Sequence, residues 1–241
     1  MEPKKDLDPT PAVDVPTPSD TPAEYWRKAR KFAEKHYGDE MVRIWSTSFD
    51  KVTPHFFFLE CVWVIHATGF NAKVVSSLLP RLKMAYGLGA DGTGWDVLAR
   101  TPEQEMLDRV LPVCNNPQKA RAVRIIATLM HEAMFPEDGN VLPKTWEEFR
   151  AERLSTPALL AKLPYIGKVT CHHLARNIGI LSSVKPDLHL VRLAEHWGFE
   201  SCDDMCEAMR PPGWPLGIVD LVLWYASSTF GTLDARKEGA R

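Results

Sequence analysis

The chain has 241 residues, of which 45% are hydrophobic, and its formal net charge is −2. This length and composition can bury one sizeable core or the cores of two small lobes. The charge excludes a protein that binds nucleic acid through overall basicity, so any contact with DNA would need a local patch.

The cysteines and the hydropathy of the chain indicate the cellular compartment in which the protein is expected. The five cysteines are odd in number and have no framework spacing, at Cys61, Cys114, Cys171, Cys202 and Cys206. This pattern favours a reduced, intracellular setting. No apolar run reaches the ~20 residues of a membrane span, and the N-terminus lacks the apolar segment of a signal peptide. We therefore expect an intracellular protein without a membrane partner.

The chain begins with a Pro-rich stretch, residues 1–22, which we interpret as a disordered tail. Apolar periodicity then predicts helices over 22–37, 54–70, 71–84, 95–111 and 115–134, with a Gly-rich loop at 86–94. The helix over 54–70 is apolar on all sides, which is typical of a buried central helix. Glu60 interrupts it, so we expect this carboxylate either to have a partner or to face a pocket. No stretch shows strand alternation, and the predicted fold class is all-α.

The most informative stretch is 163–192. A short helical segment over 156–162 leads into a tight turn, 163–168, and a helix follows until Gly179 ends it. Backbone N–H groups at the start of this second helix can hold a phosphate. Further on, Pro186 and Asp187 read as the start of another helix, with Asp187 at the N-cap. A purely capping role for Asp187 stays open.

These motifs resemble the helix-hairpin-helix (HhH-GPD) DNA glycosylase superfamily. The hairpin of that family runs Leu-Pro-Gly-hydrophobic-Gly and is matched here at 163–167, with Tyr165 in place of the first glycine. The catalytic pattern Asp-x-His-hydrophobic-x-Arg is matched at 187–192. The resemblance implies two lobes with a DNA cleft between them. A domain over 23–241 would consist of a middle lobe, about 54–180, and a second lobe from 23–53 with 181–232.

The resemblance also implies roles for single residues. Asp187 would act on the sugar or base of a flipped nucleotide, with His189 and Lys185 beside it in the sequence as further catalytic candidates. His66, which precedes an Ala-Thr pair, matches the position that probes the duplex. The remaining residues expected to bind DNA are Pro164, Tyr165, Gly167, Lys168, Thr170 and Arg192.

Cofactor and lyase chemistry are judged from the same alignment of motifs. Bifunctional members carry a nucleophilic lysine two residues after the second hairpin glycine, where this chain has Val169. Lys168 is one residue early, about 100° around a helix, so lyase activity is not expected. Only Cys202 and Cys206 lie where an iron–sulfur cluster would need four cysteines. We expect no cluster, no metal and no other cofactor, and a monovalent cation at the hairpin is the one ion the resemblance allows.

A second resemblance concerns the residues around Asp187. The segments 174–177, 185–190 and 192–194 look like a phage-associated branch linked to thymine hypermodification, which includes glutamyl/putrescinyl thymine pyrophosphorylases and amino acid:DNA transferases. Lys185 would place a positive charge beside the carboxylate and offer a phosphate contact. This resemblance implies that an amine, such as that of glycine, displaces phosphate from a phosphorylated hydroxymethyl group on thymine. It would place the protein in the host cytoplasm, where the modification protects phage DNA from restriction.

Two alternatives stay beside this hypothesis. A monofunctional DNA N-glycosylase of base-excision repair would use Asp187 to stabilise the oxocarbenium ion and to activate water. A DNA-binding module that kept the fold and lost the chemistry is the third, although the presence of Asp187 argues against it.

Overall fold

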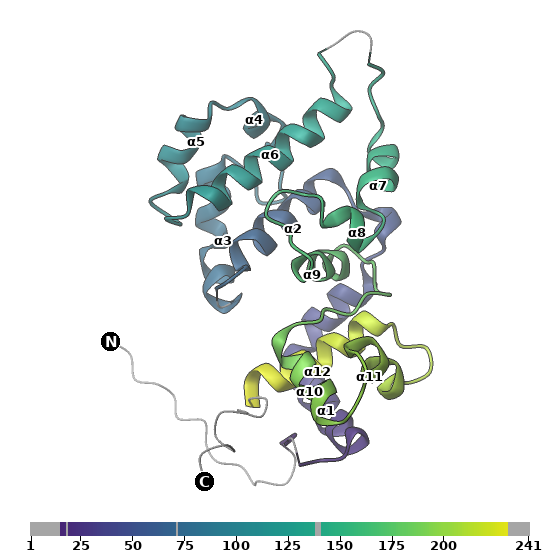
Figure 1. Cartoon of the computed structure of the whole chain (residues 1–241). Helices are drawn as coiled ribbons and strands as arrows, with labels where there is room; N and C mark the ends of the chain where they lie inside the picture. The colour runs from purple at the N-terminus through teal and green to yellow at the C-terminus, as the bar shows by residue number, and fades with distance from the viewer. Residues whose placement is uncertain (1–14, 18, 71, 138–140, 231–241) are drawn as a thin grey trace, which may run out of the picture. The chain divides into compact units, whose positions relative to one another are not determined.

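A computed structural model describes residues 15–17, 19–70, 72–137 and 141–230, and the regular elements in these ranges are all helical (Figure 1). The predicted tail, residues 1–22, lies largely outside the described residues. The chain divides into two compact units. We call Arg43–Lys185 the hairpin unit, and Met1–Val42 with Pro186–Arg241 the terminal unit. The sequence placed these boundaries near 53 and 180, whereas the structure places them after Val42, within a helix, and after Lys185.

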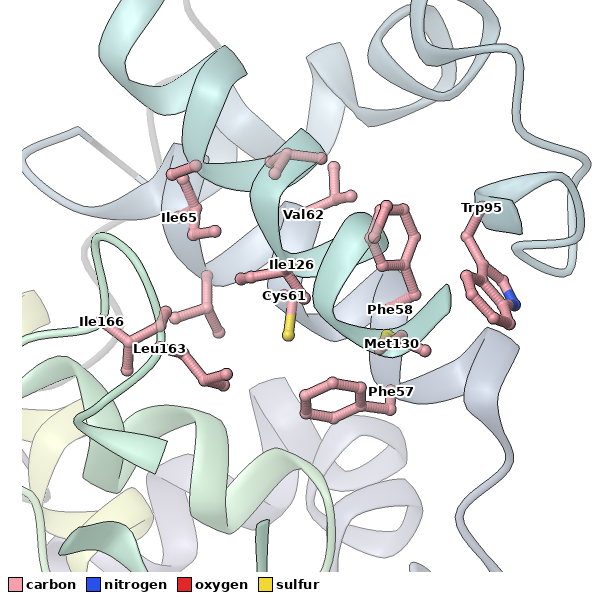
Figure 2. Packing of buried hydrophobic residues seen from close by; sticks show 14 of the residues in the cluster. Phe57, Phe58, Cys61, Val62, Ile65, Trp95, Ile126, Met130, Leu163 and Ile166 are labelled. Atoms are coloured by element: carbon pink, nitrogen blue, oxygen red, sulfur yellow. The ribbon is translucent and has the colours of Figure 1, made fainter. Parts of the chain in front are cut away.

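Helix α2 (Pro54–Ala67) is the centre of the hairpin unit and packs against α3 (Ala72–Tyr86), α6 (Pro117–Met134) and α9 (Thr170–Asn177). Its Phe57, Phe58 and Cys61 are completely buried. Figure 2 shows these side chains in one cluster with residues of α6 and of the turn before α9. The apolar character of 54–70 therefore reflects a helix that is enclosed by its neighbours.

Local sequence determines where the helices of this unit begin. Thr53, Asn116 and Thr156 each cap a helix with a side-chain oxygen, and proline follows each of them at the first helical position. Proline suits that position because its missing N–H would have no helical partner. The helix that starts at Thr156 is α8 (Pro157–Leu160).

Two stretches of the hairpin unit differ from the sequence-based expectation. The predicted helix over 95–111 is broken into α4 (Trp95–Arg100) and α5 (Glu103–Val110), because Pro102 at the N-cap of α5 disfavours helix continuation. Helix α7 (Trp146–Leu154) was not predicted, although Thr145 and Glu148 form a reciprocal capping box at its start. The 3-10 turn η1 (Phe49–Lys51) lies before α2.

The terminal unit combines the first part of α1 (Pro22–Ser46) with α10 (Leu188–His196), α11 (Cys202–Met209) and α12 (Leu216–Phe230). Aromatic pairs join α1 to the C-terminal elements. Tyr25 meets Trp197 with ring centroids 5.1 Å apart, and Tyr37 stacks on Tyr225 at 3.8 Å. Tyr37 also has non-helical backbone angles, which kink α1 before the unit boundary. None of the described helices could cross a membrane.

Candidate functional site

The connection between α8 and α9 is a tight turn of four residues, Leu163 to Ile166. The Ile166 N–H donates to the Leu163 carbonyl oxygen at 3.1 Å, which closes the turn. Leu163 and Ile166 are buried in the core of the hairpin unit, where Figure 2 shows them near α2 residues. The turn is thus anchored by its two ends, and its middle residues, Pro164 and Tyr165, lie at the surface.

Tyr165 has a backbone φ of 64°, the only positive φ of a non-glycine residue in the described part of the chain. Proline at the second position and a left-handed residue at the third are the pattern of a type II turn, in which glycine is strongly preferred at the third position. The turn therefore adopts this geometry with tyrosine at the position that favours glycine, at a cost in backbone strain of about 1–3 kcal/mol.

Four backbone N–H groups after this turn point to an anion site. Those of Gly167, Lys168, Val169 and Thr170 have no hydrogen-bond acceptor among the described residues. Val169 stands at the N-cap and offers no side-chain oxygen to take one of them. Gly167 and Lys168 are exposed, and a Cβ added at Gly167 would meet no atom within 4 Å. These N–H groups could donate to a phosphate oxygen, and phosphate binding here stays a prediction.

His66 is not where a residue that probes DNA would be expected. Its side chain is 2% exposed, and its Nε2 lies 2.9 Å from the Tyr86 hydroxyl. Burial, with a smaller effect of the Lys119 charge, lowers the pKa of His66 to about 4. The imidazole is therefore neutral and turned inward, and in this conformation it is not available to contact DNA.

Lys119 holds the end of α2 and was not recognised from the sequence. Its ammonium donates to the carbonyl oxygens of His66 at 2.8 Å and Thr68 at 2.6 Å, although the residue is only 1% exposed. A cation at the C-terminus of a helix is favoured by the helix dipole. The same Nζ lies 4.4 Å from the ring centroid of Phe70 and 5.9 Å from that of Tyr165. Lys119 thereby joins the loop after α2 to the hairpin.

Glu60 has the partners that the sequence required of it. Its Oε1 accepts from Arg43 at 3.2 Å and its Oε2 from Asn177 of α9 at 2.8 Å. Nearby on α9, burial together with the positive charges of Arg176 and Lys185 holds the pKa of His173 well below its usual range. Lys185 and the buried Arg176 therefore both lie within electrostatic range of His173.

Asp187 caps α10 in the terminal unit. Its Oδ1 accepts from the backbone N–H of His189 at 3.0 Å and of Leu190 at 3.2 Å. The side chains of Asp187, His189 and Arg192 are all half-buried on the first turns of this helix. The capping part of the prediction is therefore met, and the three residues of the motif lie within the first turns of one helix.

The cysteines after this helix behave as packing residues. Cys202 and Cys206 are buried on α11, and burial, followed by the carboxylate of Asp220, raises the pKa of Cys202 to about 11. Both thiols are protonated at neutral pH, since the pKa of Cys206 is raised as well. Among the described residues, no three His, Cys, Asp or Glu side chains gather as metal ligands would.

The sequence and the structure were compared with those of known proteins. No family model and no curated protein matches the sequence. The structure is similar to that of Methanocaldococcus jannaschii 8-oxoguanine glycosylase/lyase in complex with a 15mer DNA containing 8-oxoguanine, with a TM-score of 0.54 and 17% sequence identity. The match covers 87% of this chain and 99% of that chain. The fold is that of a helix-hairpin-helix DNA glycosylase. The predicted fold class, all-α with this topology, is confirmed.

Proposed function

We propose that this chain is an enzyme that acts on a base of DNA. The observation that carries the proposal is the run of four N–H groups without acceptors, placed directly after the hairpin of a glycosylase fold. Such a run would bind a backbone phosphate and position the strand without reading its sequence. Enzymes that act on a base must take it out of the stack or find it unpaired, and Asp187 is the candidate carboxylate for the reaction.

The preferred reaction is the transfer of an amino acid to a phosphorylated 5-hydroxymethyluracil in DNA. The amine attacks the exocyclic methylene carbon, so that a C–N bond forms while the C–O bond to the phosphate breaks. The phosphate leaves with the bonding electron pair, and Asp187 or His189 accepts the proton released by the ammonium. In a phage, this step would be part of thymidine hypermodification that protects the genome from restriction inside the host cell.

The positive charge of Lys185 favours transfer over base excision. A departing phosphate needs cations to offset its charge. Lys185 is half-buried and only two residues before Asp187 in the chain, whereas Arg176 is 3% exposed and would act only at a distance. Lys168 and Arg192 are further cationic candidates. Excision of a base has no departing phosphate and would use these charges only for DNA contacts.

Monofunctional excision of a base is the second candidate. It is favoured by the likeness to a glycosylase/lyase that was crystallised with DNA containing 8-oxoguanine. Asp187 would then stabilise the positive charge that develops on the sugar and would activate a water molecule. Val169 occupies the position of the lyase lysine and carries no amine, so strand cleavage by that route is not expected.

Mass spectrometry of nucleosides distinguishes the two reactions. DNA that carries phosphorylated hydroxymethyluracil is incubated with the protein and a mixture of amino acids, and then digested. Transfer predicts a nucleoside that has gained one amino acid and lost phosphate, and its mass names the donor. Free base with an abasic site left in the strand would identify a glycosylase. If neither product appears on this substrate or on a panel of damaged bases, the enzymatic proposal is wrong.

The Asp187→Asn variant tests the role of the carboxylate. Asparagine is as good an N-cap as aspartate, so folding and DNA affinity should stay close to those of the wild type. Turnover should fall below detection, because the amide can neither accept a proton nor carry negative charge. Near-wild-type turnover in this variant would show that Asp187 only caps the helix and takes no part in the reaction.

A further inference from the structure

We propose that Tyr165 and Phe70 form a stacking platform for an unpaired DNA base, so that the preferred ligand is a strand with an unpaired nucleotide next to the hairpin. This inference rests on the proposed function, because it names the class of DNA that the same site would take. We call the two rings, with the Lys119 ammonium behind them, the aromatic platform.

The first observation is the strain at Tyr165. A tyrosine with a φ of 64° stands where glycine would fit without cost. Backbone strain of this kind persists where the surrounding structure imposes it, and it concentrates at functional sites. Yet the phenol ring contributes little to the core, because the residue is 38% exposed. The ring is therefore held at the surface despite its conformational cost.

The second observation is the exposure of Phe70, whose ring lies near the same Lys119 ammonium as the ring of Tyr165. Phe70 is 56% exposed, and the Lys119 Nζ lies 4.4 Å from its ring centroid. Since Lys119 is itself 1% exposed, the accessible area of the ring lies on the side away from the ammonium. Cation–π attraction is favourable at 4.4 Å for Phe70 and at the edge of its range, 5.9 Å, for Tyr165, and both rings keep exposed surface for another π system. Burial lowers the pKa of Lys119, but its two carbonyl acceptors favour the charged form.

The third observation is the position of the platform relative to the N–H groups. Tyr165 precedes Gly167, the first of the four residues 167–170 whose N–H groups have no acceptor, by only two positions. A phosphate held there would carry its own nucleotide past the rings. Aromatic side chains beside a phosphate site are the elements by which proteins bind single strands, with about 1–3 kcal/mol per stacked base. A paired base inside a duplex offers no free face, so the platform selects unpaired nucleotides.

The test compares variants of the full chain on oligonucleotides that contain 2-aminopurine, whose fluorescence is quenched when it stacks. Tyr165→Gly removes the ring and relieves the strain, whereas Tyr165→Phe keeps the ring. Phe70→Leu removes the second ring. Phe135→Leu is the matched control, because Phe135 is also 56% exposed but lies at the end of α6, with its ring tilted against that of His131.

The wild type, Tyr165→Phe and Phe135→Leu should quench the probe and bind the single strand more tightly than the matched duplex. Tyr165→Gly and Phe70→Leu should bind the single strand about 5- to 100-fold more weakly, with much smaller losses on the duplex. A higher melting temperature for Tyr165→Gly would show that the loss is not one of folding. Unchanged quenching and affinity in Tyr165→Gly, or failure of the wild type to bind either DNA, would overturn the platform.

Failure of this inference is separate from failure of the proposed function, because binding and quenching need no turnover. Ring-dependent quenching without product would contradict the proposed enzymatic activity and support the aromatic platform. Unchanged turnover and unchanged DNA binding after Tyr165→Gly would support the enzymatic activity and contradict the aromatic platform.

Discussion

His66 is a buried histidine whose charge state is set by its surroundings. It lies on α2 with one ring nitrogen 2.9 Å from the Tyr86 hydroxyl, while Nδ1 has no partner among the described residues. Burial and the nearby Lys119 lower the pKa of the imidazole to about 4. An unfolded histidine titrates near 6.5, so the unfolded chain binds more protons than the folded chain between these two values.

This difference predicts acid sensitivity. The neutral His66 contributes its full stability above pH 6.5, and the contribution is lost as the pH falls through the unfolded pKa towards 4. Between pH 7 and pH 5, the free energy of unfolding should fall by about 2 kcal/mol from this residue alone. Urea denaturation at pH 7 and pH 5 measures this change in the free energy of unfolding. His66→Gln, which cannot be protonated, should show a smaller fall, and an equal fall would assign the effect to other groups such as His173.

Single residues also show where sequence reasoning succeeds and fails. Asp187 was predicted at an N-cap because Pro186 and the following apolar spacing mark a helix start, and both are local signals. The inward orientation of His66 was missed because it depends on Tyr86 and Lys119, 20 and 53 residues further along the chain. Lys119 itself reads as an ordinary lysine in the first turn of α6. Only the packing of three elements makes it a buried cation.

At the scale of the element, the end of α9 is fixed by a glycine. Gly179 has a φ of 87°, and the N–H groups of Gly179 and Ile180 donate to the carbonyl oxygens of Arg176 and Ala175. These two bonds form a Schellman motif. The chain also passes close to the residues before α2 at this point. A Cβ at Gly179 would lie 2.6 Å from the Thr47 carbonyl oxygen and 2.7 Å from the Phe49 nitrogen.

Gly179→Ala should therefore lower the free energy of unfolding by more than conformational strain alone. We expect a loss of at least about 2 kcal/mol, because the methyl group meets backbone atoms that cannot turn aside. Gly69→Ala is the matched control, since Gly69 lies in the same unit with a φ of 74° and has no atom within 4 Å of the added Cβ. It should cost about 1 kcal/mol. Equal losses in the two variants would mean that the close approach is relieved at little cost.

Helix starts were predictable where a cap and a proline occur together, as at Thr53 and Asn116, because both signals act within one turn. The same rule could have found α7, since Thr145 and Glu148 have the spacing of a capping box. Its apolar periodicity is weak because charged residues make up much of the helix and one of its buried residues is Arg150, and the helix was therefore overlooked. The split between α4 and α5 was marked by Pro102, which the apolar spacing across 95–111 concealed.

At the scale of the whole molecule, the candidate residues are divided between the two units. The hairpin, the aromatic platform and Lys185 belong to the hairpin unit, and Asp187, His189 and Arg192 belong to the terminal unit. The hydrophobic cluster from Val52 to Ile178 lies entirely within the hairpin unit. This unit therefore has the core that independent folding requires, whereas the catalytic candidates on α10 depend on a unit built from both ends of the chain.

A fragment of residues 38–185 tests whether the hairpin unit folds and binds DNA without the catalytic candidates of the terminal unit. It begins after the kink at Tyr37 and retains Arg43, whose ion pair with Glu60 belongs to the hairpin unit. The fragment should be helical by circular dichroism and unfold cooperatively in urea. It should also bind a single strand in a manner that depends on Tyr165, because every residue of the platform is present. Turnover should be absent, as in full-length Asp187→Asn, because Asp187 and His189 are missing. A fragment that lacks a cooperative transition would show that the hairpin unit requires the terminal unit to fold, and the platform would then act only within the intact chain.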